Sequence, residues 1–471
     1  MLQSVEETNT AESEERRRIE RRMAAGQSAG AVVLTFSDRR VNALNRRDIS
    51  NESLAAEATA VLTEAANTYQ AAIAEMPAVE PKNPADRLTH VGFSETEAPV
   101  TANGWSPARA YTYHSYDPYQ ALNPGHVKAT ADFIDIAKDQ INKLRITHDP
   151  KLTYLGTDRA KNESTLVTEI VKNMDPGIDA WVSELPAAEG LRPVAKPWNN
   201  EPIIVMDETG KIIDLPQTAA LRAFVGGGGD GRAVREREAW ERSMMRGILQ
   251  QAELPDRTLT ITSLGTGTGE PAMDTALEVM KAAYQDGDYA VVVNGFDISG
   301  RSLAIAQDIA NRKNVPENLA FKPRRANILS AKGIEQAVGT TGANVIEAIG
   351  LSEYVPSDGA PTQEEHDKRE EMKAKRCLSA QEFYATIYAN MPEGSVFLTG
   401  NMRDDSPQGD FITDGLGWPG IIRRSTEDYM RILEESGIPG EAVRLYMPDK
   451  NDSAAVYNMV AITKLPTGAA K

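Results

Sequence analysis

Three glycines at alternate positions are the residues of this chain best placed to do chemistry. They are Gly265, Gly267 and Gly269, in the segment Ser-Leu-Gly-Thr-Gly-Thr-Gly. A run rich in β-branched residues at 259–262 precedes them, and helix-forming residues follow at once. A strand end, a glycine turn and a helix start can together bring backbone N–H groups up to a ligand. Taken alone the segment is weak evidence for a ligand-binding site, because a tight strand–helix turn without a ligand has the same residues.

Polar residues stand at the ends of the strands that follow. Asp297 ends a β-branched run at 290–296, and Asn327 follows an expected strand at 319–323. In an open α/β sheet a ligand lies outside the carboxyl ends of the strands, so we expect both side chains near the glycine turn. The alternatives are that Asp297 caps a helix and that Asn327 is a simple turn residue.

Alternating strands and helices after residue 230 must position these side chains. Such alternation is typical of a mostly parallel sheet with helices on both faces, and predicts an α/β domain. The last two strands, 442–446 and 455–462, have too short a connection for a helical crossover and should form an antiparallel hairpin. The other expected strands are 259–264, 290–296, 319–323, 343–349 and 395–399, and the expected helices are about 232–250, 270–286, 299–313, 330–338, 379–391 and 425–437.

The sequence before residue 230 predicts a mostly helical region. Residues 1–30 are polar and charged, and an Arg-rich helix within them is expected to be solvated or frayed rather than to bind nucleic acid or acidic lipid. Within 31–225, apolar spacing predicts helices at about 51–76, at about 126–146 and after 162, and a β-hairpin at 203–215. The glycine-rich segment 226–231 is expected to be a flexible linker to a domain spanning 232–465.

Between the first two helices, seven prolines in 77–124 predict an irregular connection. This segment carries an aromatic patch. The expectation is that the patch packs a long loop onto the body, and the alternative is that it walls a substrate pocket. The patch comprises Trp105, Tyr111, Tyr113, His114, Tyr116 and Tyr119.

Composition narrows the classes of partner. The chain has 471 residues and a formal charge of −17, which disfavours a nucleic-acid partner. A single cysteine, Cys377, excludes an intrachain disulfide and a multi-thiolate zinc site, and the five histidines lack metal-ligand spacing, so no metal is expected. Neither a long apolar run nor a signal peptide is evident, so we expect a cytoplasmic protein without a membrane partner.

Four ordered motifs together resemble class I S-adenosylmethionine-dependent methyltransferases. They occur at the ends of successive expected strands, and the terminal hairpin fits the same family. The resemblance covers about residues 230–465 and implies a Rossmann-like sheet; it says nothing about 1–215. The motifs are Ser263–Gly269, Phe296–Ser299, Arg325–Leu329 and Ile346–Tyr354.

The resemblance implies S-adenosyl-L-methionine as cofactor and assigns residues to its parts. The glycines would lie against the methionine portion, Asp297 would accept hydrogen bonds from the ribose hydroxyls, and Asn327 would frame the adenine. The expected cofactor-binding residues are Ser263, Gly265, Thr266, Gly267, Thr268, Gly269, Asp297, Ile298, Ala326, Asn327, Ile328, Ile349, Gly350 and Leu351.

One departure from the family pattern and one rival function bear on this cofactor assignment. The family commonly has an acidic residue where Ser263 stands, and Glu270 and Asp274 are the candidates to compensate for it. The rival for the fold is a nicotinamide-binding oxidoreductase, whose Gly-x-Gly-x-x-Gly fingerprint is not matched because the third glycine comes one place early. A carboxylate at Glu270 would repel a pyrophosphate, which also favours the methyl donor.

The methyl acceptor and the catalytic base are not named by the sequence. Composition favours a small-molecule acceptor, and the oligomeric state stays open. Base candidates by location are Glu347, Glu353, Tyr354 and His366, and acceptor-binding candidates are Asn401, Arg403, Trp418 and Arg423. The charge run 368–375 is expected to be an exposed helix face or a mobile lid.

The predicted function is therefore methyl transfer by in-line displacement at the sulfonium carbon. A catalytically silent S-adenosylmethionine-binding or regulatory protein is the alternative, with the N-terminal half as an interaction module. An NAD(P)-binding oxidoreductase is the third.

Overall fold

The chain forms two compact units, each of which is described by itself. Unit 1 comprises Met1–Leu88, Asp117–Val234 and Pro407–Gly420, and unit 2 comprises Thr89–Tyr116, Arg235–Ser406 and Ile421–Lys471. The computed structural model describes residues 49–147, 166–184, 194, 196–198, 202–207, 209–251, 258–283, 290–313, 315–359, 363–416, 418, 421–449 and 456–466. None of the helices in these ranges combines the length and apolar character needed to cross a bilayer.

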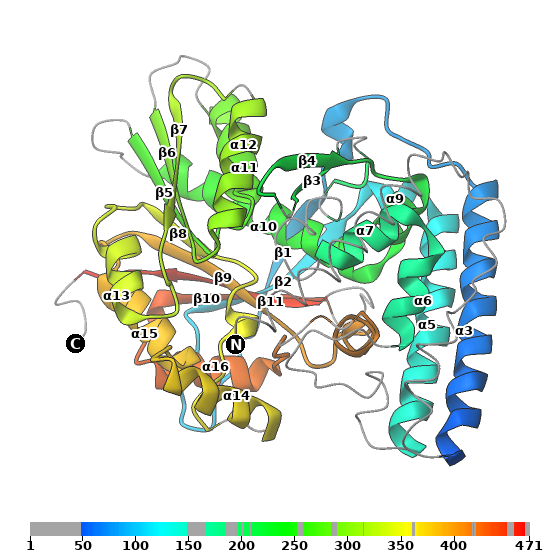
Figure 1. Cartoon of the computed structure of the whole chain (residues 1–471). Helices are drawn as coiled ribbons and strands as arrows, with labels where there is room; N and C mark the ends of the chain where they lie inside the picture. Colours follow the sequence, from blue (N-terminus) through cyan, green and yellow to red (C-terminus); the bar gives the residue numbers. More distant parts are fainter. Residues whose placement is uncertain are drawn as a thin grey trace. The chain divides into compact units, whose positions relative to one another are not determined.

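Unit 2 is built on a nine-stranded sheet of order β1-β2-β10-β11-β9-β8-β5-β6-β7 (Figure 1). Strands β9, β8, β5, β6 and β7 are parallel to one another, while β11 pairs antiparallel with both β9 and β10. The predicted α/β sheet and its terminal hairpin are therefore confirmed. The strands are β1 (His90–Thr96), β2 (Arg109–Tyr116), β5 (Thr258–Leu264), β6 (Ala290–Asp297), β7 (Leu319–Arg325), β8 (Val345–Ala348), β9 (Val396–Met402), β10 (Val443–Pro448) and β11 (Tyr457–Thr463).

Helices follow the parallel strands as the alternation predicted. Ser299, Ser379 and Ser425 each cap a helix by accepting a backbone N–H with the side-chain oxygen. Apolar residues of α15 and α16, such as Phe383 and Leu433, are buried in the core under the sheet. The helices are α10 (Gly229–Gln251), α11 (Glu270–Ala283), α12 (Gly300–Arg312), α13 (Ala331–Ile334), α14 (Gln363–Ala374), α15 (Ala380–Asn390) and α16 (Thr426–Glu435), and short π or 3₁₀ turns lie at Glu335–Gly339, Ser352–Tyr354 and Gly440–Ala442.

Unit 1 is mostly helical, as predicted, and holds the small antiparallel hairpin of β3 (Ile203–Met206) and β4 (Ile212–Leu215). Its core is aromatic: Tyr69, Phe133 and Phe224 lie with ring centroids 5.8–6.1 Å apart. The helices are α3 (Ile49–Glu75), α4 (Pro118–Leu122), α5 (Pro124–Thr147), α6 (Leu166–Met174), α7 (Pro176–Glu184) and α9 (Ala219–Gly227), with shorter turns at Pro84–Arg87 and Phe411–Gly415. The predicted tail at 1–30 lies outside the described residues.

The expectation of an irregular connection at 77–124 was wrong, because β1 and β2 lie within it. The prolines bracket these strands and do not interrupt them, so both strands keep their ladder hydrogen bonds. In unit 2, Tyr111 stacks on Tyr446 of β10 with centroids 5.0 Å apart, and Trp105 donates to the Ile438 carbonyl at 2.9 Å. These contacts support packing as the role of the aromatic patch.

The glycine-rich segment at 226–231 is not a linker. Gly226 and Gly227 end α9, and Gly229 begins α10. A Cβ on Gly226 would lie 2.3 Å from the Tyr119 ring, and one on Gly227 would lie 2.7 Å from the His126 carbonyl oxygen. The glycines allow α9 to approach α4 and α5 closely. In a sequence, glycines needed for close packing look the same as glycines that make a linker flexible. The boundary between the units falls at Val234, inside α10.

Candidate functional site

The glycine turn leaves the carboxyl end of β5 and enters α11, as the motif predicted. All three of its glycines have positive φ: +70° at Gly265, +52° at Gly267 and +69° at Gly269. Side chains other than glycine rarely adopt this backbone conformation. The spacing of the glycines therefore follows from the turn, whatever binds there.

Much of the turn's hydrogen bonding goes to the end of β6. Gly265 and Thr266 both donate their backbone N–H to the Phe296 carbonyl, at 2.8 and 3.0 Å. The backbone N–H of Gly267 donates to Asp297 Oδ2 at 3.0 Å. The backbone N–H groups of Gly265, Thr266 and Gly267 are thus used to fix the shape of the turn.

Gly265 lies within van der Waals distance of two neighbouring loops. A Cβ built there would meet Leu351 Cδ1 at 3.4 Å and Ile328 Cδ1 at 3.6 Å, so residues from three loops converge on this glycine. Gly269 differs, because a Cβ there would lie 2.8 Å from the Phe321 ring. Gly269 therefore serves packing. Thr266 and Thr268 are both buried in the turn.

Asp297 lies beside the turn, at the end of β6. Its Oδ1 accepts from the Ser299 backbone N–H at 2.8 Å, while Oδ2 accepts from Gly267. Ser299, and not Asp297, caps α12, so the helix-cap interpretation of Asp297 was wrong. A carboxylate has lone pairs beyond these two contacts and can accept further hydrogen bonds. Next to it, Ile298 is 57% exposed, unusual for a large apolar residue.

Asn327 occupies a turn after β7. Its Oδ1 accepts from the Leu329 backbone N–H at 3.1 Å, as in the turn interpretation. The side chain is exposed, whereas its neighbours Ala326 and Ile328 are buried. Asn327 can therefore contact a ligand while it keeps the hydrogen bond that forms the turn.

A buried acidic cluster lies under the turn. Ser263 of β5 and Glu347 of β8 are partners across the parallel strand pair, and Glu347 Oε2 accepts from the Ile349 backbone N–H at 3.2 Å. Burial raises the pKa of Glu347, while the neighbouring Ser263 hydroxyl, the Ile349 amide and Arg237 oppose the rise. Burial and the charge of Glu347 raise the pKa of Glu241 on α10 well above its usual value.

Arg237 is the cation of this cluster. Its Nη1 lies 2.7 Å from where a Cβ of Gly350 would be, and Gly350 has a φ of +82°. The guanidinium also lies over the Tyr457 ring, 5.1 Å from the centroid, and donates to the Tyr457 hydroxyl at 3.3 Å. Gly350 therefore makes room for Arg237, and Ile349 beside it is half-buried.

Glu270 and Asp274 do not supply the carboxylate missing at Ser263. Lys313, at the end of α12, lies 3.1 Å from Glu270 Oε1 and 2.7 Å from Asp274 Oδ1. This pairing also weakens the argument that Glu270 would repel a pyrophosphate, because the carboxylate is neutralised by Lys313.

The candidate bases are not gathered at one place. His366 lies on the exposed face of α14, with its side chain 60% exposed and near Asp367. Glu353 is buried in the 3₁₀ turn after β8, and the ring of Tyr354 lies 5.8 Å from Lys368 Nζ. Glu347 contacts the loop that carries Leu351 through the Ile349 backbone N–H, and Tyr354, on that loop, donates its backbone N–H to the Leu351 carbonyl at 3.0 Å.

The candidate acceptor residues serve internal contacts. Asn401 is buried, and its Oδ1 accepts from Arg424 Nη1 at 2.7 Å. Arg403 pairs with Asp405, and Arg423 donates to the Asp404 carbonyl at 3.4 Å. Trp418 belongs to unit 1, whereas the other three belong to unit 2.

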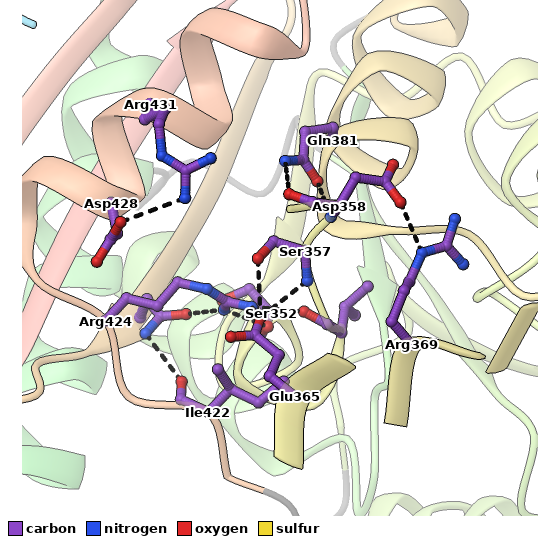
Figure 2. Close-up of polar contacts among 12 residues, drawn as sticks. Ser352, Ser357, Asp358, Glu365, Arg369, Gln381, Ile422, Arg424, Asp428 and Arg431 are labelled. Carbon is purple, nitrogen blue, oxygen red and sulfur yellow. Dashed lines mark hydrogen bonds and ion pairs between the residues drawn. The ribbon is translucent and has the colours of Figure 1, made fainter. Parts of the chain in front are cut away.

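Sequence reasoning missed a buried ion pair between Arg424 and Glu365, 3.1 Å apart (Figure 2). Arg424 also donates to the carbonyls of Ser352 and Val355, and Glu365 accepts from the backbone and hydroxyl of Ser357. The network fastens the start of α14 to the loop after β8. It therefore argues against the interpretation of 368–375 as a mobile lid, although α14 is helical as predicted.

The missed residues had a weak signal in the sequence. Arg237 and Glu241 are four residues apart on α10, on the same side as the packing residue Trp240 and not opposite it. Charged residues that fall among apolar ones on a helix indicate a buried polar site. No comparable pattern marks Arg424 or Glu365, whose pairing joins segments far apart in sequence.

Comparisons with known proteins show low similarity throughout. No protein-family profile and no curated protein sequence matches the chain. Among solved structures, a possible exported protein from Bordetella parapertussis is 15% identical over 73% of this chain and 97% of that one, with a TM-score of 0.41. The CMeT domain of the citrinin polyketide synthase is 15% identical over 92% of this chain and 99% of that one, with a TM-score of 0.38.

A third solved structure is magnesium protoporphyrin IX methyltransferase from Synechocystis PCC 6803 with bound SAH. It is 12% identical over 50% of this chain and 87% of that one, with a TM-score of 0.32. At such identities and scores these structures carry no activity over to this chain. The site has to be interpreted from its own residues.

Proposed function

We propose that unit 2 binds S-adenosyl-L-methionine at the glycine turn and transfers its methyl group to a small-molecule acceptor. The observation that carries the proposal is the convergence of Leu351 and Ile328 on Gly265, with Asp297 beside the turn. This convergence lies at the carboxyl ends of β5, β6 and β8. The strand order reverses between β5 and β8, the place where open α/β sheets bind ligands.

Each part of the donor has a matching group. The methionine portion would lie over Gly265, where any side chain would fill the space against Leu351. Asp297 keeps lone pairs for the ribose hydroxyls while holding the turn. The exposed Ile298 and buried Ile328 offer apolar surface to the adenine, which would cover the face of Ile298 that is exposed.

The chain's contribution to the reaction is positioning. A sulfonium methyl group is already activated, so holding the acceptor in line with the breaking bond and excluding water supply most of the rate. A base is required only for an acceptor that must lose a proton, and Glu347, which accepts from the Ile349 backbone N–H, is a candidate for it.

A catalytically silent donor-binding protein is the second candidate. Asn401, Arg403 and Arg423 are used in internal contacts. Donor binding without turnover on a broad acceptor panel would favour this candidate.

Isothermal titration of the folded full-length protein tests donor binding. We expect binding of S-adenosylmethionine and S-adenosylhomocysteine, and none of NAD⁺ or NADP⁺. Asp297→Ala should weaken donor binding by about 1–3 kcal/mol, because the ribose loses its acceptor. Asp308→Ala, an exchange on the opposite end of α12, is the matched control. Tight NAD⁺ binding without S-adenosylmethionine binding would replace the proposal with the oxidoreductase.

A further inference from the structure

A serine, a histidine and an aspartate lie in a row at the β1–β2 edge of the unit 2 sheet. Asp449, directly after β10, has Oδ2 3.0 Å from His114 Nδ1. The other ring nitrogen, His114 Nε2, lies 3.5 Å from Ser94 Oγ. A nucleophile within reach of a base, with the base oriented by a third group, is the arrangement that recurs in serine hydrolases on unrelated folds.

The carboxylate decides which nitrogen of His114 can act as a base. A carboxylate only accepts hydrogen bonds, so the neutral imidazole carries its proton on Nδ1, toward Asp449. Nε2 then has a free lone pair directed at the Ser94 hydroxyl. The distance of 3.5 Å is long for a hydrogen bond, as contacts between catalytic groups often are before a substrate binds.

The register of the strands positions the nucleophile and the base. Gly92 is the direct partner of His114 across the strand pair, so Ser94, two residues further along β1, is its diagonal neighbour on the same face. Ser94 and His114 are both exposed. A Cβ on Gly92 would meet no atom of the described residues within 4 Å, so this face beside the imidazole is open to a substrate.

The outer edge of β1 supplies a backbone donor for a developing negative charge. The Tyr113 carbonyl accepts from the Asp449 backbone N–H at 3.3 Å, so the backbone of Tyr113 faces β10 and that of His114 faces β1. By the same alternation, Ser94 faces β2 and Glu95 directs its N–H away from β2, at the end of the sheet. No described residue accepts from this N–H. The N–H of the residue after the nucleophile is an oxyanion donor in other serine hydrolases.

We propose that Ser94, His114 and Asp449 form a second catalytic site, which hydrolyses activated carboxylic esters through an acyl-serine. Ser94 Oγ bonds to the carbonyl carbon and its proton passes to His114 Nε2. The ester C–O bond then breaks, and Nε2 gives the proton to the leaving oxygen. Water repeats the sequence on the acyl-serine, so one ester and one water give a carboxylic acid and an alcohol with no other reactant.

The surroundings of the site favour aryl esters and separate it from the methyl donor site. Tyr116 follows His114 by two residues on the same face and is 55% exposed, so an aromatic group of the substrate has a ring to pack on. Five strands lie between β1 and β5 in the sheet order. The proposed hydrolysis therefore does not depend on ligand binding at the glycine turn.

Labelling of the full-length protein with diisopropyl fluorophosphate, located by peptide mass spectrometry, tests the inference, because this probe reports serines with an activated hydroxyl. We expect modification of Ser94 in the wild type, and none at this position in His114→Gln. Hydrolysis of p-nitrophenyl acetate gives the second readout. Its kcat/KM should fall about 100-fold in His114→Gln and in Ser94→Ala, and at least about tenfold in Asp449→Asn.

The control is His90→Gln, which removes another exposed histidine of β1 and should keep the wild-type rate and labelling. Circular dichroism establishes that each variant is folded. Absence of Ser94 labelling in the folded wild type would overturn the inference, as would equal hydrolysis by the wild type and Ser94→Ala. An Asp449→Asn protein that unfolds at a lower temperature but is labelled as fast as the wild type would show that Asp449 is merely structural, and the triad would fail.

Discussion

Two buried polar clusters of unit 2 treat charge in opposite ways. Around Arg424, one guanidinium and one carboxylate face each other, and carbonyls, an amide side chain and a serine hydroxyl take up their remaining hydrogen-bonding capacity (Figure 2). Around Glu241, Glu347 and Glu238 raise the pKa of that carboxyl while Arg237 and Arg242 lower it, and a carboxylate oxygen has no partner among the described residues. Burial is similar in both clusters, and the difference lies in how far the buried charges are neutralised and hydrogen-bonded.

Whether a buried charge is neutralised by its neighbours distinguishes a structural role from a functional one. A buried ion pair whose hydrogen bonds are all made holds segments together and gains nothing from a ligand. A buried pair of like charges costs stability, and its raised pKa values mark it as a site candidate. Both clusters touch the loop after β8, the first through the carbonyls of Ser352 and Val355 and the second through the Ile349 backbone N–H.

Removing Arg424 should produce the largest effect. Arg424→Met would leave Glu365 as a buried carboxylate without its cation, and we expect a loss of about 3–5 kcal/mol in the free energy of unfolding. Urea denaturation followed by circular dichroism measures it. Arg431→Met, which breaks half-exposed pairs with Asp428 and Glu435, should cost less than about 1 kcal/mol. Equal losses in both variants would contradict the assigned difference between the networks.

Replacing Glu241 should act in the opposite direction. Its pKa is raised in the folded protein, so the wild type loses stability as pH rises from the unfolded pKa through the folded one. Glu241→Gln has no charge to bury and should be more stable than the wild type by about 1–3 kcal/mol at pH 8, with little difference at pH 4.

Urea denaturation at a series of pH values measures this difference. The exposed Glu335→Gln should follow the wild type at every pH. A destabilised Glu241→Gln with no dependence on pH would show that Glu241 makes a structural hydrogen bond, and the contrast between the two clusters would fail.

The predictable parts of the fold are those set by local patterns. β-branched runs, serine caps and the short connection before β11 are all legible within a few residues, and the sheet, helices and hairpin of unit 2 follow from them. The tight turn at Gly265, which has a positive φ, could likewise be predicted, because glycines at this spacing favour such a backbone conformation.

The errors arose where distant segments meet. Prolines in 77–124 suggested irregularity, but β1 and β2 form because β10 offers β2 a parallel partner more than 300 residues away. Gly226 suggested flexibility, and its true partner is the Tyr119 ring. Composition cannot distinguish a glycine that frees the chain from one that admits a neighbour.

The same limit applied to the site. Gly265, Asp297 and Leu351 come from motifs that lie at strand ends, so their convergence could be predicted. Glu241 lies on α10, before the first motif, and nothing local shows that its side chain reaches Glu347. Asn401 looked available for an acceptor because its partner Arg424 is 23 positions away.

Ile298 offers the mildest test of the site, because it separates ligand contact from packing. Its side chain is 57% exposed, so Ile298→Ala should change the free energy of unfolding by less than about 0.5 kcal/mol. If the adenine lies on it, the same substitution should weaken S-adenosylmethionine binding by about 1 kcal/mol, since apolar area covered by the ligand is lost. Ile136→Ala, an exposed isoleucine of unit 1, is the control and should leave affinity unchanged. Unaltered affinity in both variants would move the adenine away from the end of β6, and the ribose contact proposed for Asp297 would have to move with it.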